Sequence, residues 1–273
     1  MRNLAPYIGI TDFRSFEQVQ AMLEVFKKHK HPKSPRQLHV GAMMSYKTLH
    51  GLPTKWTAAF PKANEYAGIF ASPETFNCLH FADYEDGRPD IAASLEEAIA
   101  LCGPHLHAIQ LDMVWPDPTQ IGKGYYQGCQ RLGLDPRQVD IILQINRVAI
   151  ERMKSTSPFV TDLDLLINNI RHYEDRIHRV LVDKSMGQGI GMNATELLPI
   201  VDAIDESGYA LVGVAGGLGP ETMNLVEPIV AQFPFVSIDA QGRLRPSGKA
   251  LDPIDWEMAK QYLIRALEMF GEN

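Results

Sequence analysis

Residues 178–222, HRVLVDKSMGQGIGMNATELLPIVDAIDESGYALVGVAGGLGPET, contain the repeating unit that decides the fold. A short apolar run at 178–183 is followed by a helical pattern at 194–207 and a second apolar run at 210–215. Short runs rich in β-branched residues are typical of buried strands. A strand, an amphipathic helix and a strand in this order indicate a parallel pair joined by a crossover helix.

The same alternation extends along the whole chain. The expected strands are 6–11, 38–44, 77–81, 106–111, 139–145, 178–183, 210–215 and 235–239. The expected helices are 15–29, 94–102, 119–132, 161–174, 194–207, 220–232 and 253–270. The segment 45–75 contains Pro53 and Pro61, so we expect it to supply the second helix together with an extended loop. Eight alternating units without a low-complexity linker predict an α/β fold, a single-domain (β/α)8 TIM barrel over residues 1–273, with a doubly wound open sheet as the alternative.

The composition narrows the class of partner. A net charge of −7 argues against a nucleic-acid surface, because such surfaces need clustered positive charge to neutralise phosphates. Cys78, Cys102 and Cys129 are far apart and show no CxxC or Cys/His ligand spacing, so neither a metal site nor a disulfide framework is predicted. The first residues lack the apolar run of a signal peptide, and no run of 18 apolar residues occurs. We therefore expect a cytoplasmic protein that does not bind membranes and that could form a homo-oligomer.

Polar residues stand where strands are expected to end, and in a TIM barrel these ends surround one mouth. Asp183 ends the strand at 178–183, and a carboxyl group partly shielded from water there can act as a general acid or base. A structural aspartate that caps the next loop is the alternative reading of Asp183. The further candidates for the mouth are Asp12, Gln110, Asp112 and Arg147.

Other polar residues in the strands are weaker candidates. Gln144 and Asp239 could also line the mouth, although such residues more often brace loops or fill the barrel interior. His80 and His107 lie within expected strands and are interpreted as structural histidines rather than metal ligands. Lys184 follows Asp183 directly, so strand alternation turns it away from the barrel interior.

Glycine-rich loops follow the seventh and eighth strands. Gly216 and Gly217 allow the backbone to approach a ligand closely, and Pro220 suits the first turn of the helix expected after them. Free N–H groups at such a position favour an anion, and the loops after strands 7 and 8 often bind phosphate in TIM barrels. A phosphate site is therefore predicted, with a plain strand-to-helix turn as the alternative. The glycines at 187–191 are interpreted as a loop that folds over a ligand or as a flexible connector.

These segments resemble the phosphoribosylanthranilate isomerase family, a TIM barrel of tryptophan biosynthesis. The run IGIT at 8–11 is similar to the family's CGIT, and IQLD at 109–112 is similar to its VQLHG. VAGGLGPETM at 214–223 is similar to LAGGLxPENV, and SIDAQGRLRPSGKALDP at 237–253 is similar to GVDVSSGVE…PGxKD. The last two similarities are the most specific, because order, spacing and the following helical pattern agree.

The resemblance implies a cofactor-independent Amadori rearrangement of a phosphorylated aminoaldose into an aminoketose. It also implies that Asp183 is the general acid that helps open the furanose ring. Ile8 stands where the family has its basic cysteine, and the family's arginine after strand 2 has no counterpart, so Asp12 is the candidate replacement base. The backbone residues that the resemblance assigns to the phosphate are Gly216, Gly217, Ala240, Gln241 and Gly242.

Two other functions stay open alongside a sugar-phosphate isomerase. A phosphosugar lyase or aldolase would use Lys184 or Lys47 to form a Schiff base with its substrate. A non-catalytic barrel would keep the phosphate-binding loops and lack a base. In all three cases the expected partner is a phosphorylated small molecule.

Overall fold

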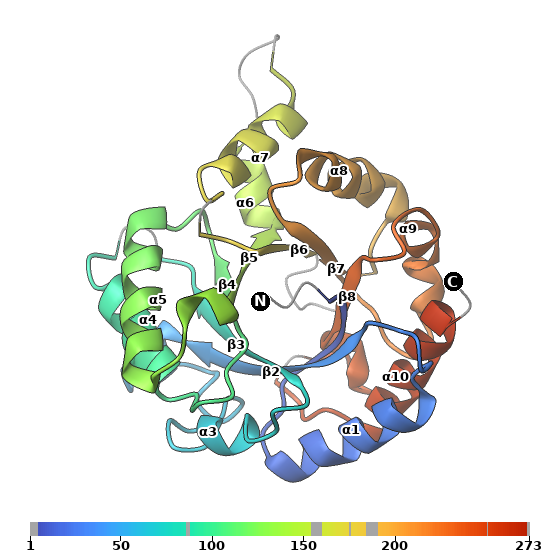
Figure 1. The fold of residues 1–273 in the computed structure, drawn as a ribbon, viewed down its shortest axis with the longest axis horizontal. Helices are drawn as coiled ribbons and strands as arrows, with labels where there is room; N and C mark the ends of the chain where they lie inside the picture. The colour runs from blue at the N-terminus through green and yellow to red at the C-terminus, as the bar shows by residue number, and fades with distance from the viewer. Residues whose placement is uncertain are drawn as a thin grey trace.

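Eight parallel strands form a closed barrel in the order of the sequence, with the helices around the outside (Figure 1). The computed structural model describes residues 5–85, 88–153, 160–174, 176–183, 191–249 and 251–271. The last strand pairs with the first, where Ile8 lies opposite Ile238, and this pairing closes the sheet. The predicted TIM barrel is therefore confirmed, and the open-sheet alternative is wrong.

Every expected strand overlaps an observed one. The strands are β1 Tyr7–Thr11, β2 Gln37–Ser45, β3 Phe76–Asp83, β4 Ala108–Met113, β5 Asp140–Asn146, β6 Arg179–Asp183, β7 Leu211–Ala215 and β8 Ser237–Ala240. The α-helices of the described ranges are α1 Phe16–His29, α2 Tyr46–Leu49, α3 Tyr66–Ile69, α4 Ile91–Ala100, α5 Pro118–Leu132, α6 Arg147–Arg152, α7 Asp162–Arg171, α8 Ala194–Ser207, α9 Glu227–Gln232 and α10 Trp256–Gly271. None of these helices has both the length and the apolar character needed to cross a bilayer.

The helix pattern differs from expectation after β7. In place of one helix over 220–232, the chain forms a 3₁₀ turn at Met223–Leu225 and then α9 from Glu227. Pro228 lies in the first turn of α9, and a proline there would break a helix that began earlier, because it has no N–H and its ring clashes with the preceding turn. No helix therefore begins at Pro220, and the expected helix N-terminus beside the glycine loop is absent from this described segment.

Two further segments refine the expected pattern. Residues 45–75 form the two four-residue helices α2 and α3, which are separated by turns. The six-residue helix α6 was not expected, since one and a half turns are too short to show helical periodicity. Asn146 caps it by accepting a hydrogen bond from the N–H of Ala149 at 2.9 Å.

Alternate residues of each strand face opposite sides of the barrel wall. In β1, Ile8 and Ile10 are fully buried in the core between the strands and the helices. Thr11, the last residue of β1, instead faces the interior and contacts Asp239 of the adjacent strand β8. This two-residue period turns alternate residues of each strand toward the barrel interior, and several of those at the strand ends are polar.

Large side chains fill the barrel interior at the end where the strands begin. Arg179 and Asp140, the first residues of β6 and β5, form an ion pair of 2.7 Å between Nε and Oδ2, with both side chains buried. Tyr7, the first residue of β1, stacks on His39 and Phe76 at ring-centroid distances of 4.6 and 5.7 Å. This packing leaves the functional cavity at the opposite end, where the strands terminate.

Candidate active site

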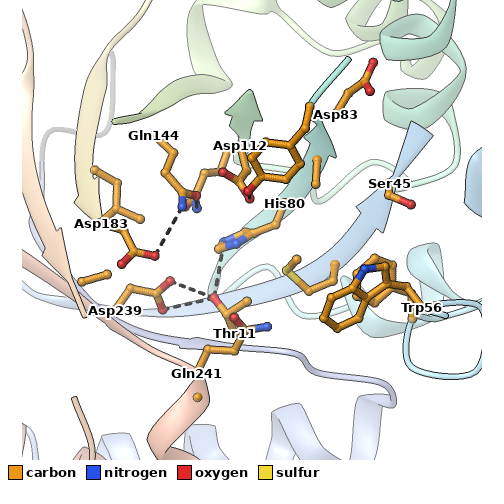
Figure 2. A pocket seen from close by; sticks show the side chains of 18 of the residues that line it. Thr11, Ser45, Trp56, His80, Asp83, Asp112, Gln144, Asp183, Asp239 and Gln241 are labelled. Carbon is orange, nitrogen blue, oxygen red and sulfur yellow. Dashed lines mark hydrogen bonds between the residues drawn. The ribbon is translucent and has the colours of Figure 1, made fainter. Parts of the chain in front are cut away.

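A cavity of about 350 Å³ lies at the carboxyl ends of the strands (Figure 2). This volume falls within the range of small-molecule sites. The predicted site residues that line it are Gln110, Asp112, Asp183, Gly216, Gly217, Gln241 and Gly242. The structure thus brings most of the predicted residues together at one mouth.

Asp183 is held by a chain of two glutamine side chains. Gln110 of β4 donates from Nε2 to Oε1 of Gln144 at 2.7 Å, and Gln144 of β5 donates from Nε2 to Oδ2 of Asp183 at 3.4 Å. All three side chains are buried, with Asp183 7% exposed. The two amides therefore orient this carboxyl group from one side, while the cavity is open to it from the other.

Asp239 faces Asp183 from the neighbouring part of the barrel wall (Figure 2). The hydroxyl of Thr11 lies 3.1 and 2.9 Å from Oδ1 and Oδ2 of Asp239 and donates to this carboxyl group. Burial raises the pKa of Asp239 to about 7, and the nearby charge of Asp183 raises it too, while the bond from Thr11 lowers it. The cavity thus holds a carboxyl group that changes protonation near neutral pH.

Asp112 is a third carboxyl group in the cavity. The hydroxyl of Tyr84 donates to its Oδ2, and Asn146 donates from Nδ2 to Oδ1 at 3.3 Å. Burial raises the pKa of Asp112 to about 6, while the hydrogen bonds from Tyr84 and Asn146 lower it. The side chain that caps α6 therefore also positions an acidic group of the cavity.

Aromatic side chains form another wall of the cavity, and they come from the long connection after β2. Trp56 and Phe60 line the cavity, and their rings stack at 5.4 Å with an interplanar angle of 14°. Tyr46 also lines it and donates its hydroxyl to Asp90 Oδ2 at 2.7 Å. Part of the 45–75 extension therefore covers one side of the mouth.

The glycine loop after β7 has the backbone conformation that its sequence predicts. Gly216 and Gly217 have φ angles of 133° and 63°, which favour glycine. The N–H of Met192 donates to the carbonyl of Gly216 at 3.0 Å, and the hydroxyl of Thr222 donates to that of Gly217 at 2.7 Å. These bonds hold the loop against the cavity with no contribution from a helix N-terminus.

The other three predicted site residues do not line the cavity, and neither does Ile8, which stands at the position of the family's cysteine. Asp12, with a φ of 99°, forms a buried ion pair with Arg245, and Arg14 lies 3.3 Å from the same carboxyl oxygen. Arg147 is more than half exposed and lies 3.9 Å from Glu151. The other two, Ile8 and Ala240, are buried in the outer core.

The two lysines considered for Schiff-base chemistry differ in what the structure shows. Lys47 lines the cavity, but its side chain is 50% exposed and its Nζ lies 3.7 Å from Glu85. A lysine that forms a Schiff base is usually desolvated, which lowers its pKa. Lys184 lies outside the described residues, as do residues 187–190 of the predicted covering loop.

Carboxyl groups dominate the charge of the cavity. Within the described part of the lining, Lys47 is the one lysine or arginine, and the acidic residues are Asp83, Glu85, Asp112, Asp183 and Asp239. This balance disfavours an anion among the carboxyl groups and favours hydroxyl or amine groups there.

Four further residues line the cavity, although sequence reasoning did not place them among the main site candidates. These are Thr11, His80, Gln144 and Asp239. They can be found in the sequence by taking every second residue back from the last residue of each strand, because alternate residues of a strand face the same side. Trp56 and Phe60 carry no such signal, because their position depends on the path of a long connection.

The sequence matches no protein-family model and no curated protein. Solved structures with a similar fold include phosphonopyruvate hydrolase, with a TM-score of 0.51, 10% identity and coverage of 86% of this chain and 75% of that one. Orotidine 5′-phosphate decarboxylase from Lactobacillus acidophilus has a TM-score of 0.51, 11% identity and coverage of 98% and 100%. The carboxyl transferase domain of pyruvate carboxylase from Rhizobium etli has a TM-score of 0.52, 10% identity and coverage of 98% and 47%. At these identities the similarity shows the barrel fold alone.

Proposed function

We propose that this protein is a cofactor-independent isomerase of a phosphorylated sugar or sugar-amine, similar in reaction to phosphoribosylanthranilate isomerase. The observation that carries the proposal is the pair Asp183 and Asp239, two buried carboxyl groups that face each other in one cavity (Figure 2). Two carboxyl groups that share a site resist ionising together, so one holds a proton while the other is charged. Such a pair supplies both an acid and a base.

The pair accounts for both proton transfers of an Amadori rearrangement. Although burial raises the pKa of Asp239, the pair reacts from the state that has its one proton on Asp183 and its charge on Asp239. From that state Asp183 gives its proton to the ring oxygen as the bond from that oxygen to C1 breaks and the amine nitrogen forms a double bond to C1. The ionised Asp239 then removes the proton from C2, and the resulting enol-amine becomes the aminoketose by tautomerisation. Asp239 therefore takes the role for which Asp12 was the sequence-based candidate, because Asp12 is engaged by Arg245.

The distribution of charge supports the substrate class. The carboxyl groups and Gln144 suit the hydroxyl and amine groups of a sugar, while the backbone beside Gly216 and Gly217 suits a phosphate. The aromatic wall with Trp56 suits a planar or apolar substituent. Phosphoribosylanthranilate combines these three parts and is therefore the first substrate to test.

The test is the loss of phosphoribosylanthranilate fluorescence on addition of the protein, with Asp183→Asn and Asp239→Asn in parallel. We expect turnover by the wild-type protein and a loss of at least 100-fold in kcat in each variant, the range of general acid–base catalysis. Asp202→Asn, which changes an exposed aspartate of α8, is the control and should keep full activity.

Each negative result has a distinct meaning. Near-normal kcat in a folded Asp183→Asn protein would overturn the assignment of the acid. A wild-type protein that binds ribose 5-phosphate without any turnover would favour a non-catalytic barrel or another substrate. Trapping of a substrate adduct on Lys47 or Lys184 by borohydride would instead support the lyase alternative.

A further inference from the structure

Three potential metal ligands lie together in the barrel interior, next to the cavity. His39 comes from β2, and Cys78 and His80 come from β3. One ligand atom of each lies within 4.8 Å of the other two, and all three side chains are buried. The proposed isomerase reaction uses none of them.

The distance between the two imidazoles suits a shared ion. Nε2 of His39 and Nε2 of His80 lie 3.4 Å apart, which is longer than an ordinary hydrogen bond between nitrogen atoms. Two nitrogen ligands about 2.1 Å from a tetrahedral zinc ion are separated by roughly 3.4 Å. The rings therefore already stand at the spacing that such an ion requires.

The far side of the His39 ring provides a second, independent observation. Its Nδ1 is buried without a hydrogen-bond partner in the described structure and lies 3.9 Å from Oδ1 of Asp239. A histidine that binds a metal usually presents its other nitrogen to a carboxylate, which fixes the proton on that nitrogen. The tautomer that carries its proton on Nδ1, on the side of Asp239, has the lone pair of Nε2 on the side of His80.

Glycine residues leave the space that the two rings occupy. A Cβ atom on Gly41 would lie 3.0 Å from Nε2 of His80, and one on Gly9 would lie 2.9 Å from Nδ1 of His39. His80 also lines the cavity, where Figure 2 shows it beside Thr11. The ligand cluster is thus enclosed by the barrel, and one of its members, His80, also borders the cavity.

We propose that His39, Cys78 and His80 bind one divalent transition-metal ion, with zinc preferred because two imidazoles and one thiolate suit it. Binding forms a bond from the ion to Sγ of Cys78 and releases the thiol proton to solvent. Cys78 and His80 are two residues apart on β3, but sequence spacing does not reveal the site, because His39 joins them from β2.

The test is a titration of the metal-free protein with Co²⁺, which gives a thiolate-to-cobalt charge-transfer absorption when a cysteine binds it. We expect saturation at one equivalent and displacement by Zn²⁺. Cys78→Ser should lose the absorption, while Cys102→Ser, which changes another fully buried cysteine in the outer core, should keep it. His80→Gln should weaken Co²⁺ binding at least tenfold, with folding checked by circular dichroism.

The outcomes separate this proposal from the proposed reaction, because none of them depends on turnover. Absence of saturable Co²⁺ binding by the wild-type protein would overturn the metal site, and so would an unchanged spectrum in Cys78→Ser. If Cys78→Ser does not fold, the His80→Gln titration decides. Unchanged Co²⁺ affinity in that variant refutes the site.

Discussion

Asp239 is a buried carboxyl group whose environment opposes its charge. The titratable groups that face it include Asp183 from β6 and His39 from β2, and its hydrogen bond comes from the neutral hydroxyl of Thr11. Because burial raises the pKa of Asp239 from 3.8 to about 7, the folded protein binds a proton that the unfolded chain has already released. The stability that this group contributes is complete below pH 3.8 and is lost as the pH rises to about 7.

Asp239→Asn should therefore stabilise the protein at high pH. The amide keeps an oxygen that accepts from Thr11 and removes the buried charge, so we expect the free energy of unfolding to rise by on the order of a few kcal/mol at pH 8 and by less at pH 5. Urea unfolding at the two pH values measures this difference, with Asp202→Asn as the exposed control. An equal effect at both pH values would show that the pKa of Asp239 is not raised by folding.

The loop between β7 and α9 is the element that carries the phosphate prediction. Because no helix starts at Pro220, only the backbone of the loop itself is available to bind a phosphate. Two hydrogen bonds to the carbonyls of Gly216 and Gly217 hold this backbone in place. The φ of 63° at Gly217 allows the chain to turn beside the cavity at no steric cost. Any side chain at this position strains the turn and narrows the approach to the backbone.

Gly217→Val should weaken binding of ribose 5-phosphate at least tenfold, because it strains the loop and obstructs the backbone. Two substitutions by alanine separate the strain in the loop from the obstruction of the backbone. Gly217→Ala and Gly208→Ala both place a Cβ at a positive φ, 63° and 67°, and each should cost about 1 kcal/mol of stability. Gly208 ends α8, where a Cβ meets no atom within 4 Å, so only the change at Gly217 should lower phosphate-ester affinity in calorimetry. Equal affinities in both proteins would make the loop purely structural.

The whole molecule is a barrel with two different ends. The ion pair between Asp140 and Arg179 and the rings of Tyr7 and Phe76 fill the end where strands begin. The end where strands terminate holds carboxyl groups in a cavity. Stability and function are therefore separated along the barrel axis, apart from buried groups such as Asp239 that serve the site at a cost to stability.

Asp140→Ala should lower the free energy of unfolding by about 3–5 kcal/mol, because it leaves the Arg179 guanidinium buried without this carboxylate. The matched control is Glu74→Ala, which removes a surface pair with Lys27 of similar length, 2.6 Å, and should cost about 1 kcal/mol or less. Urea unfolding measures both. Equal losses in the two variants would show that the Asp140–Arg179 pair does not support the closed end.

The sequence by itself determined the number and order of the strands, since a two-residue period and a helical period are local properties of the chain. It also placed Asp183 at the end of a strand and Gly217 in the loop after another, and a parallel barrel brings all such positions to one mouth. Only the tertiary structure decided that Asp12 pairs with Arg245, that Asp239 faces Asp183, and that Trp56 lies against the cavity. These outcomes depend on which side chains meet in the barrel and on how deeply they are buried. The local pattern of apolar and polar residues contains no information about these contacts or about burial depth.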